Sequence, residues 1–270
     1  MGFAKDSFKW DELTITRGIV ETFMSDFLDS IDLDVAVVGA GPSGITAARI
    51  LANEGHKVGI FERNLQIGGG IWGGGMLFPR IAVEQEAAWL MEEVGIRLRE
   101  WEDGTVIADA VESATKMTAA AIDAGARILV GIEAEDVVVD DDNRVCGVVI
   151  NWGAVSGAGL HVDPLAVHAK VVIDGTGHPC ELSRLVETRV PGACIDNLFE
   201  CIPGEASMNA RAGEAALIEN TREVYPGLIV SGMAANAISK SYRMGAIFGG
   251  MLLSGQKAAQ IASEIVKSRS

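Results

Sequence analysis

The chain has 270 residues, 49% of them hydrophobic, and its 37 acidic and 22 basic residues give a formal net charge of −15. A chain of this length buries enough core to fold without a disulfide or a structural metal. Mean hydropathy is +0.26, yet no uninterrupted apolar run reaches the roughly 20 residues of a membrane-spanning helix. Residues 1–10 include Lys5, Asp6 and Lys9 and lack an apolar signal core, so we expect no export and no membrane partner.

The acidity also argues against nucleic acid as a partner, because a sequence pI near 4.7 repels phosphate backbones and the basic residues are scattered. The cysteines form no C-x-x-C pair and show no metal-ligand spacing among themselves, which favours reduced thiols and a cytoplasmic location: they are Cys146, Cys180, Cys194 and Cys201. Glycine is in excess, with 32 residues or about 12% of the chain against a usual ~7%.

Hydrophobic spacing predicts elements in chain order, beginning with an amphipathic helix over about residues 8–30. A short apolar run over 33–38 predicts a buried strand, followed by a helix over 42–54 and a second strand over 57–62. Such a strand–helix–strand unit favours a parallel sheet.

The rest of the chain predicts a loop, two helices, a hairpin, two strands and a closing helix: 66–79, 81–94, 109–124, 135–152 (turning at 140–143), 170–174, 228–231 and 244–267. No internal repeat, low-complexity tract or linker interrupts the pattern. We therefore expect a single α/β domain over 1–270 with a parallel central sheet, an N-terminal helix and an inserted β-hairpin.

The first glycine cluster has the pattern G-x-G-x-x-G between the first strand and its helix. Gly39 permits a tight turn, Gly41 lets the backbone approach a pyrophosphate, and Gly44 allows close packing of helix on strand. The helix N-terminus offers free N–H groups to phosphates. Glu62 ends the second strand, where an acid hydrogen-bonds the ribose of the adenosine. A glycine triplet alone is a weak signal, but the whole unit predicts a site for an ADP-containing ligand.

Two features beside this fingerprint bear on the ligand. Glu62 disfavours a 2′-phosphate, although the neighbouring Arg63 leaves that question open. The second glycine cluster, residues 68–75, surrounds Trp72. It is either a flexible surface loop or, as we favour, backbone that lies directly against the ligand, since close approach requires glycine.

A second group of residues carries reactive side chains. Pro164 biases Asp163 toward an extended conformation, in which His161 and Asp163 share a face. His178 follows the strand 170–174, at the carboxyl end where open α/β sheets bind ligands. Two histidines and one aspartate are the inventory of an Fe(II) facial triad. The alternatives are a hydrogen-bonded structural histidine and a turn-forming aspartate.

Three further polar residues have weaker sequence signals. Arg243 stands among mostly uncharged neighbours before a glycine-rich stretch. It is either a salt-bridge partner at a helix end or, in a nucleotide site, a bidentate clamp for a small carboxylate, and its neighbours alone leave both open. His56 and His168 belong to no pattern of the kind seen at His161 and His178, so we expect them at the surface.

Taken together, these motifs resemble the thiamine thiazole synthase family in its archaeal form. The resemblance extends over essentially the whole chain and rests on residues 38–44, Glu62, the loop 68–75, and residues 149–152, 161–164, 176–178 and 243–245. It implies a flavoprotein-like dinucleotide-binding fold of the glutathione-reductase type. It also implies that NAD is a substrate, which is combined with glycine and sulfur into an ADP-bearing thiazole carboxylate.

The resemblance implies a role for each matching residue. The ADP portion of the ligand would be held by Gly39, Gly41, Ser43, Gly44, Glu62, Arg63, Gly70, Ala134, Val162 and Met233. Asp163 and His178 match the Fe(II) ligands, which reduces the proposed triad to a pair, and Arg243 matches the residue that grips the glycine carboxylate. Asp163 and its neighbours would reach an adjacent protomer, since family members form ring-like homo-octamers.

One departure from other family members concerns the source of sulfur. Fungal and plant relatives carry, in place of His161, a cysteine that gives up its own sulfur, so that the protein is inactive after one turnover. Because His161 has no sulfur to give, the resemblance implies that this chain uses free sulfide and turns over repeatedly. His161 then keeps a supporting or polarising role in catalysis. None of the four cysteines falls in the motif of the family's sulfur donor.

Two other functions remain open from the sequence. An FAD-dependent oxidoreductase has the same fingerprint, but such proteins usually place an aspartate near Gly232 to hold the ribitol. Here Met233 and Ala234 occupy that stretch. A nucleotide-binding sensor that catalyses no reaction would bind an ADP derivative, and replacing Asp163 or His178 with alanine would not reduce its activity.

Overall fold

The computed structural model describes residues 10–195 and 201–269 of the chain. An eight-stranded sheet forms its centre, with the strand order β11-β12-β9-β1-β2-β6 and with β7 and β8 added at β9. Strands β1, β2, β6, β9 and β12 pair in parallel, as predicted. The central strands are β1 Asp32–Val38, β2 Val58–Glu62, β6 Arg127–Val130, β9 Leu165–Asp174, β11 Arg222–Tyr225 and β12 Leu228–Val230.

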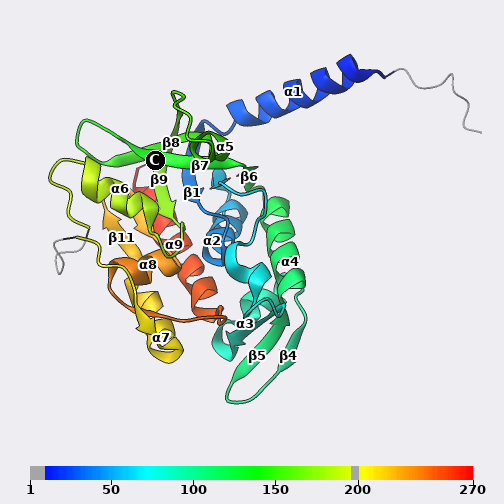
Figure 1. Ribbon diagram of the computed structural model, residues 1–270, viewed down its shortest axis with the longest axis vertical. Coiled ribbons are helices and arrows are strands. Elements are labelled where there is room, and N and C mark those ends of the chain that lie inside the picture. Colours follow the sequence, from blue (N-terminus) through cyan, green and yellow to red (C-terminus); the bar gives the residue numbers. More distant parts are fainter. Residues whose placement is uncertain (1–9, 196–200, 270) are drawn as a thin grey trace, which may run out of the picture.

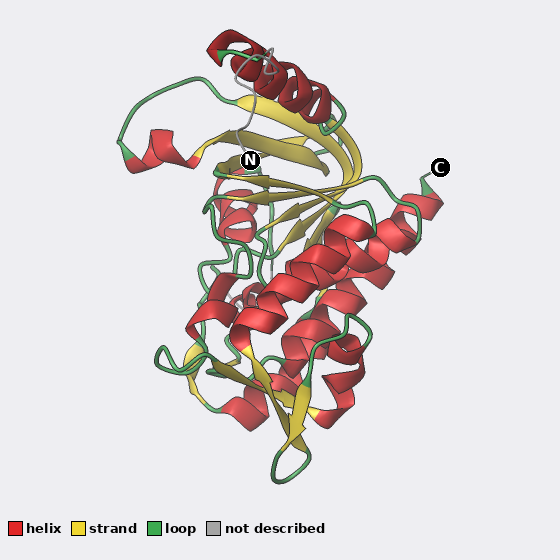
Figure 2. Cartoon of the chain, turned by 90° about the vertical axis from the view of Figure 1, so that its right-hand side faces the viewer, coloured by secondary structure: helices red, strands yellow, loops and turns green. Residues whose placement is uncertain are grey.

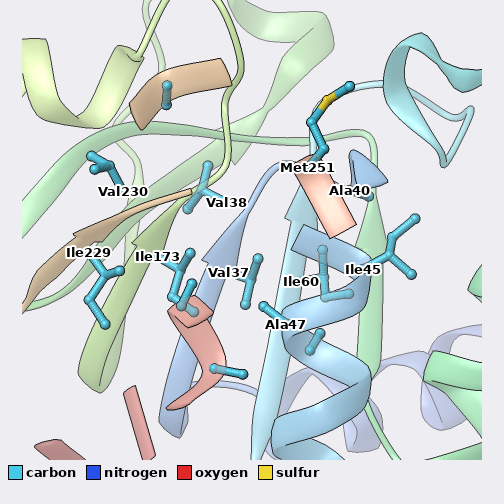
Figure 3. Close-up of a cluster of buried hydrophobic side chains, with 14 of the residues drawn as sticks. Val37, Val38, Ala40, Ile45, Ala47, Ile60, Ile173, Ile229, Val230 and Met251 are labelled. Carbon is cyan, nitrogen blue, oxygen red and sulfur yellow. The ribbon is translucent and has the colours of Figure 1, made fainter. Parts of the chain in front are cut away.

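The sheet is buried on both faces at its centre. In β1, the consecutive residues Ala36 and Val37 point to opposite faces and are both fully buried, and Val37 pairs with the buried Ile60 on one side and the buried Ile173 on the other. Figure 3 shows Val37, Ile60 and Ile173 between neighbouring strands, with Ala47 of α2 packed against them. This burial explains why the first strand is a continuous apolar run rather than an alternating one.

Helices cover the sheet (Figure 2). Helices α2 Pro42–Asn53 and α9 Gly249–Ser268 pack directly on the central strands. Outside them, α4 Ala110–Asp123 packs on α2, and α3 Gln85–Glu92 and α7 Ala210–Asn220 pack on α9. Helices α2 and α9 lie close together at Gly255 of α9. Because glycine has no side chain, the backbone of Ser43 in α2 can lie against it, and a Cβ on Gly255 would overlap the carbonyl oxygen of Ser43. The fold is therefore an α/β dinucleotide-binding fold, in agreement with the prediction.

The predicted hairpin is confirmed as β7 Ile132–Val139 and β8 Val145–Trp152, which pair in antiparallel fashion. At its turn, Asn143 adopts a left-handed conformation (φ 60°) and the Asp140 carboxylate accepts the backbone N–H groups of Asp142 and Arg144. Asparagine and aspartate tolerate such turns because their side chains satisfy the local backbone. Strand β8 also pairs with β9, so the hairpin extends the central sheet.

Two predicted helices begin later than expected. Residues Arg80–Glu84 form strand β3, which pairs with β5 Thr105–Asp109, and β5 also pairs with β4 Leu98–Glu100. Ile81 and Val83 are buried on one face of β3, a period-two pattern within an apparently helical stretch. The closing helix α9 begins at Gly249, because the chain before it is extended through β13 Tyr242–Arg243 and turns at Gly245 (φ 94°).

The N-terminal helix is α1 Glu12–Leu28, and residues 8 and 9 of its predicted range lie outside the described residues. Its Asp11 cap accepts the backbone N–H of Thr14 at 2.8 Å. Figure 1 shows α1 extending away from the other elements, and none of its side chains is buried. The remaining short elements are η1 Gly69–Gly73, α5 Gly153–Gly157, α6 Glu181–Arg189, β10 Ala206–Met208 and α8 Met233–Ile238.

No helix among the described residues combines the length and the apolar character that crossing a bilayer requires.

Candidate active site

A cleft of about 710 Å³ opens at the carboxyl ends of β1, β2 and β9. This is the edge at which open α/β sheets bind ligands. Most residues singled out in the sequence line it together: Gly39, Gly41, Ser43, Glu62, Arg63, Gly70, Ala134, His178, Met233 and Arg243. Residues separated by as much as 200 positions in the chain are thus brought to one cavity.

The three fingerprint glycines are needed for three different reasons. Gly39 has a φ of 97°, and a Cβ there would overlap the carbonyl oxygen of Gly175. Gly44 packs α2 onto the strand so tightly that a Cβ would overlap the carbonyl oxygen of Gly39. Gly41, by contrast, faces open space in the cleft, with no atom within 4 Å of an added Cβ. Only Gly41 leaves space that a ligand could occupy.

Glu62 is buried at the end of β2, and both of its oxygens have protein partners. Oε2 accepts the backbone N–H of Ala40 at 2.9 Å, and Oε1 accepts the backbone and side-chain N–H groups of Asn64 at 2.9 and 2.8 Å. The carboxylate therefore ties the fingerprint turn to the end of β2 while lining the cleft. Because Oε1 already accepts two hydrogen bonds and Oε2 only one, Oε2 has further acceptor capacity for a hydroxyl group.

The second glycine cluster packs on the first. It folds into η1, and a Cβ on Gly69 would lie 3.1 Å from the Cα of Gly41. Gly68, Gly69 and Gly74 have positive φ, a conformation that glycine adopts without strain. Gly69, Gly70, Gly74 and Gly75 line the cleft, so this segment forms one of its walls.

Arg63 bridges the rim of the cleft. Its guanidinium donates to Glu181 at 2.7 Å, joining the end of β2 to the start of α6. Burial on its own lowers the pKa of Arg63, but the hydrogen bond and charge of Glu181 outweigh this effect and raise the pKa above its ordinary value. Arg63 is cationic at every relevant pH and stands beside the ribose-binding position of the fingerprint.

His178 lies on a turn that is anchored from beneath. The buried Asp174 at the end of β9 accepts from Thr176 N–H and Oγ–H at 3.1 and 2.6 Å, and from Ser183 N–H and Oγ–H at 2.9 and 2.7 Å. These bonds tie the turn 175–178 to the first turn of α6. His178 Nδ1 lies 2.7 and 2.8 Å from the two carboxylate oxygens of Glu205.

Arg243 lines the other side of the cleft, on β13. The sequence left open whether it is a salt-bridge partner or a carboxylate clamp. In the part of the chain that the structure describes, its guanidinium has no carboxylate partner, and its backbone carbonyl accepts the N–H of Asn209. The side chain is exposed and its five donors are available to a ligand.

The segment 160–165 is separate from the cleft. His161, Val162 and Asp163 are exposed and are not among the residues that line the cavity. Asn151 of β8 donates to the carbonyl oxygen of Val162 at 3.0 Å and anchors the segment. Among residues 10–195 and 201–269, no group of three potential metal-ligating side chains comes together. The predicted facial triad is therefore not assembled within the described part of a single chain.

A model of the Thi4 family matches residues 16–248 of this chain. The chain belongs to the Thi4 family. It is 51% identical over 254 residues to a thiamine thiazole synthase of Methanothrix thermoacetophila, a match that covers 94% of this chain and 96% of the relative. It is 52% identical over 257 residues to that of Pyrococcus horikoshii, covering 95% of this chain and 99% of the relative.

Solved structures agree with this Thi4 assignment. The THI4 crystal structure from Thermovibrio ammonificans superposes with a TM-score of 0.91 at 41% identity, covering 97% of this chain and all of the other. A geranylgeranyl bacteriochlorophyll reductase-like protein from Thermoplasma acidophilum, at 18% identity and a TM-score of 0.54, shares the fold alone. The chain is thus an enzyme of thiamine thiazole biosynthesis, with a flavoprotein-type dinucleotide-binding fold.

Several residues of this Thi4 site escape the sequence analysis. Asn64, Asp174 and Glu205 act through contacts with other residues of the site, and none of them belongs to a motif of the sequence analysis. Asp174 directly precedes Gly175, so a polar residue that ends a buried strand is the one local signal. For Glu205, 27 residues from His178, no local signal exists.

One histidine prediction is wrong. His56 is largely buried rather than at the surface, because it packs between the ends of α2 and α9, where its Nε2 lies 2.8 Å from Ser263 Oγ. His168 is exposed as predicted and pairs with Asp32.

Proposed function

We propose that this chain converts NAD, glycine and free sulfide into an ADP-bearing thiazole carboxylate, releases nicotinamide and uses Fe(II). One observation carries the proposal: a single cleft holds a dinucleotide fingerprint, a histidine with a free ring nitrogen and an arginine without a carboxylate partner in the described chain. Membership of the Thi4 family supports the same reaction.

In this proposal the fingerprint holds the ADP portion of NAD. The N-terminus of α2 begins at Pro42 beside Gly41, and its free N–H groups and partial positive charge stabilise the pyrophosphate. Glu62, already oriented by Ala40 and Asn64, accepts from a ribose hydroxyl through Oε2. The nicotinamide end then points toward the part of the cleft that His178 and Arg243 line.

Arg243 binds the second substrate. Its planar guanidinium forms two parallel hydrogen bonds with a carboxylate, so it orients glycine with the amino group toward the opened ribose. The amino group then condenses with the ribose-derived carbonyl after nicotinamide has left. Arg63 differs, because Glu181 already occupies its guanidinium.

The donor set fits Fe(II). One imidazole from His178 and one carboxylate from Asp163 suit this metal and leave coordination positions open. His178 Nδ1 is held by Glu205, and within the described residues Nε2 has no hydrogen-bond partner. When bound, the metal would supply Lewis-acid chemistry to the condensing substrates.

A second copy of the chain completes the site in this proposal. Asp163 and His161 lie on the exposed segment 160–165, where Leu160 and Leu165 are 63% and 61% exposed. Helix α1 likewise presents exposed apolar side chains, and Phe23 stacks on the exposed Trp152 with ring centroids 6.5 Å apart. Exposed apolar surface of this extent indicates protein contact. We propose the homo-octamer of the family as the assembly that covers it.

The proposed sulfur source is free sulfide, because His161 has no sulfur to donate. The imidazole beside Asp163 supports or polarises the reacting groups. Cys180 is buried, and Cys146 is partly buried on the inserted hairpin. Neither lies on the segment 160–165.

The decisive experiment is anaerobic incubation with NAD, glycine, Fe(II) and sulfide. Mass spectrometry should detect an adenylated thiazole carboxylate and free nicotinamide in amounts exceeding the protein. Absence of this product from protein shown to hold iron would refute the proposal. A yellow protein with flavin absorbance would instead favour the oxidoreductase.

The shared site has its own test. Asp163→Ala and His178→Ala are each expected to be inactive. Mixed protomers should regain about a quarter of wild-type turnover, because half of the clefts keep His178 and half of the inserted segments keep Asp163. Recovery of no activity after verified subunit exchange would place both residues within one chain.

A further inference from the structure

We propose that Glu205 is a positioning residue that fixes the tautomer and orientation of the His178 ring, so that Nε2 presents its lone pair to a metal ion. This inference deepens the proposed function and rests on it for the identity of the metal. Glu205 belongs to no motif of the sequence.

The first support is the contact itself. Both carboxylate oxygens of Glu205 lie within hydrogen-bond distance of His178 Nδ1, at 2.8 and 2.7 Å. The Glu205 side chain is only 11% exposed, whereas His178 is 52% exposed. The carboxylate is therefore largely shielded from solvent and does not line the cavity, whereas the half-exposed His178 ring does.

The chemistry of the two groups determines the protonation. An ionised carboxylate has acceptors only, so the nitrogen that faces it must carry the hydrogen. In a neutral imidazole the other nitrogen, Nε2, is then unprotonated and free to bind a metal. Histidines that ligate metals commonly donate their second N–H to a carboxylate, which also raises the basicity of the ligand.

The backbone on both sides of the contact is tied down. His178 lies on the turn anchored by Asp174. The approach to Glu205 is held at Ile202, whose carbonyl accepts from Arg184 at 3.1 Å and whose N–H donates to Glu187 at 2.8 Å. Two fixed segments leave the ring little freedom to rotate, which is what a preorganised ligand requires.

A purely structural role is the alternative, in which Glu205 only attaches its loop to the turn 175–178. Glu187 provides the matched control, because it anchors the same loop through Ile202 without touching His178. A loss specific to Glu205 therefore separates orientation of the ring from attachment of the loop.

The experiment measures metal affinity rather than turnover. Under anaerobic conditions, Fe(II) and the spectroscopic substitute Co(II) are titrated into the full-length assembled protein. We expect Glu205→Ala to bind about 10- to 100-fold more weakly. Glu205→Gln keeps a neutral acceptor and should lie in between, and Glu187→Gln should stay within about twofold of wild type. Circular dichroism confirms that each variant is folded.

A second measurement needs no metal. Solid-state NMR of protein carrying ¹⁵N-histidine reports which ring nitrogen holds the hydrogen, with the His178 signals identified by their loss in His178→Gln. Wild type should show protonated Nδ1 at His178, and Glu205→Ala should shift the balance toward protonated Nε2. If Glu205→Ala leaves both the tautomer and the metal affinity unchanged, the positioning role is wrong.

The two measurements also separate this inference from the proposed function. If the Glu205→Ala tautomer shifts but wild type binds neither metal, the positioning stands and the iron-dependent function fails. If wild type binds the metals and Glu205→Ala binds them equally well, the function stands and the positioning fails. Should Glu205→Ala not fold, Glu205→Gln decides the question by the same two readings.

Discussion

The cleft and the segment 160–165 differ in how completely one chain builds them. In the cleft, both Glu62 oxygens are bonded and Gly39 and Gly44 pack against backbone. On the segment 160–165, His161 and Asp163 face solvent, and Asn151 supplies the hydrogen bond to the Val162 carbonyl. The walls of the cleft are thus fixed by contacts within one chain, whereas His161 and Asp163 of the segment 160–165 are exposed.

This difference predicts that substitutions in the two regions affect different properties of the protein. Residues of the cleft hold the central sheet and α2 together, so changing them should act on folding and on nucleotide binding. Residues of the segment contribute little buried area to this chain, so changing them should act on assembly and turnover. Four predictions test that separation.

The largest effect is expected at Gly39. Gly39→Ala places a Cβ against Gly175 in a left-handed backbone and should cost about 3 kcal/mol or more of unfolding free energy. Gly41→Ala is the matched control, because its Cβ faces open space and φ is −77°. It should unfold like wild type but bind ADP about tenfold more weakly. Urea unfolding and calorimetric titration measure both. Equal stability of the two variants would contradict the packing argument.

The second prediction concerns the exposed segment. Leu160→Asp should reduce the mass of the assembly and lower turnover by about tenfold or more, while ADP binding stays within about twofold of wild type. Ile122→Asp on α4 is the control, since Ile122 is also exposed, at 54%, but lies far along the chain from the segment. Light scattering gives the mass. An unchanged assembly would mean that the segment has no partner.

The third prediction addresses a carboxyl pair at the start of α9, beside the cleft residue Phe248. The Glu214 carboxylate accepts the N–H of Gly250 at 2.6 Å, and Glu84 lies against it. Burial first, and then the charge of Glu84, raises the pKa of Glu214 from 4.5 to about 8. The folded state therefore holds a proton that the unfolded state releases near pH 4.5.

Stability from this proton is fully present below pH 4.5 and is lost as the pH rises toward 8. The unfolding free energy of wild type should fall over that window, because the folded state binds up to one proton more than the unfolded state. Glu214→Gln mimics the protonated form and should flatten the fall. Denaturant unfolding at several pH values measures it. A Glu214→Gln profile parallel to wild type would show that another group causes the dependence.

The smallest effect is expected where the chain just after α2 contacts Ser263 of α9, remote from the cleft. The Ser263 hydroxyl donates to the Glu54 carboxylate at 2.6 Å, and its Oγ lies 2.8 Å from His56 Nε2. Ser263→Ala should lower the unfolding free energy by about 1 kcal/mol and leave ADP binding unchanged. Thermal unfolding and titration check both. A weaker affinity for ADP would show that this end of the helix pair is coupled to the cleft.

Local sequence patterns were sufficient to predict an element where its physical cause lies in neighbouring residues. The turn at Gly39, the strand 33–38 and the hairpin turn at Asn143 follow from backbone preferences within a few residues. Strand β3 was missed because the alternating Ile81 and Val83 directly precede residues with helical spacing, and the strand is defined by its pairing with β5. Pairing partners distant in sequence cannot be deduced from such a window.

The same division holds for the site. Residue types and spacing pointed to Glu62 and His178, since a fingerprint and the ends of strands have a known position relative to a parallel sheet. The role expected of Arg243 came from the family resemblance. The contact of Glu205 with His178, the burial of His56 and the separation of Asp163 from the cleft emerged from the folded chain. They depend on how distant segments pack, and a hydrogen bond across 27 residues leaves no trace in the local pattern.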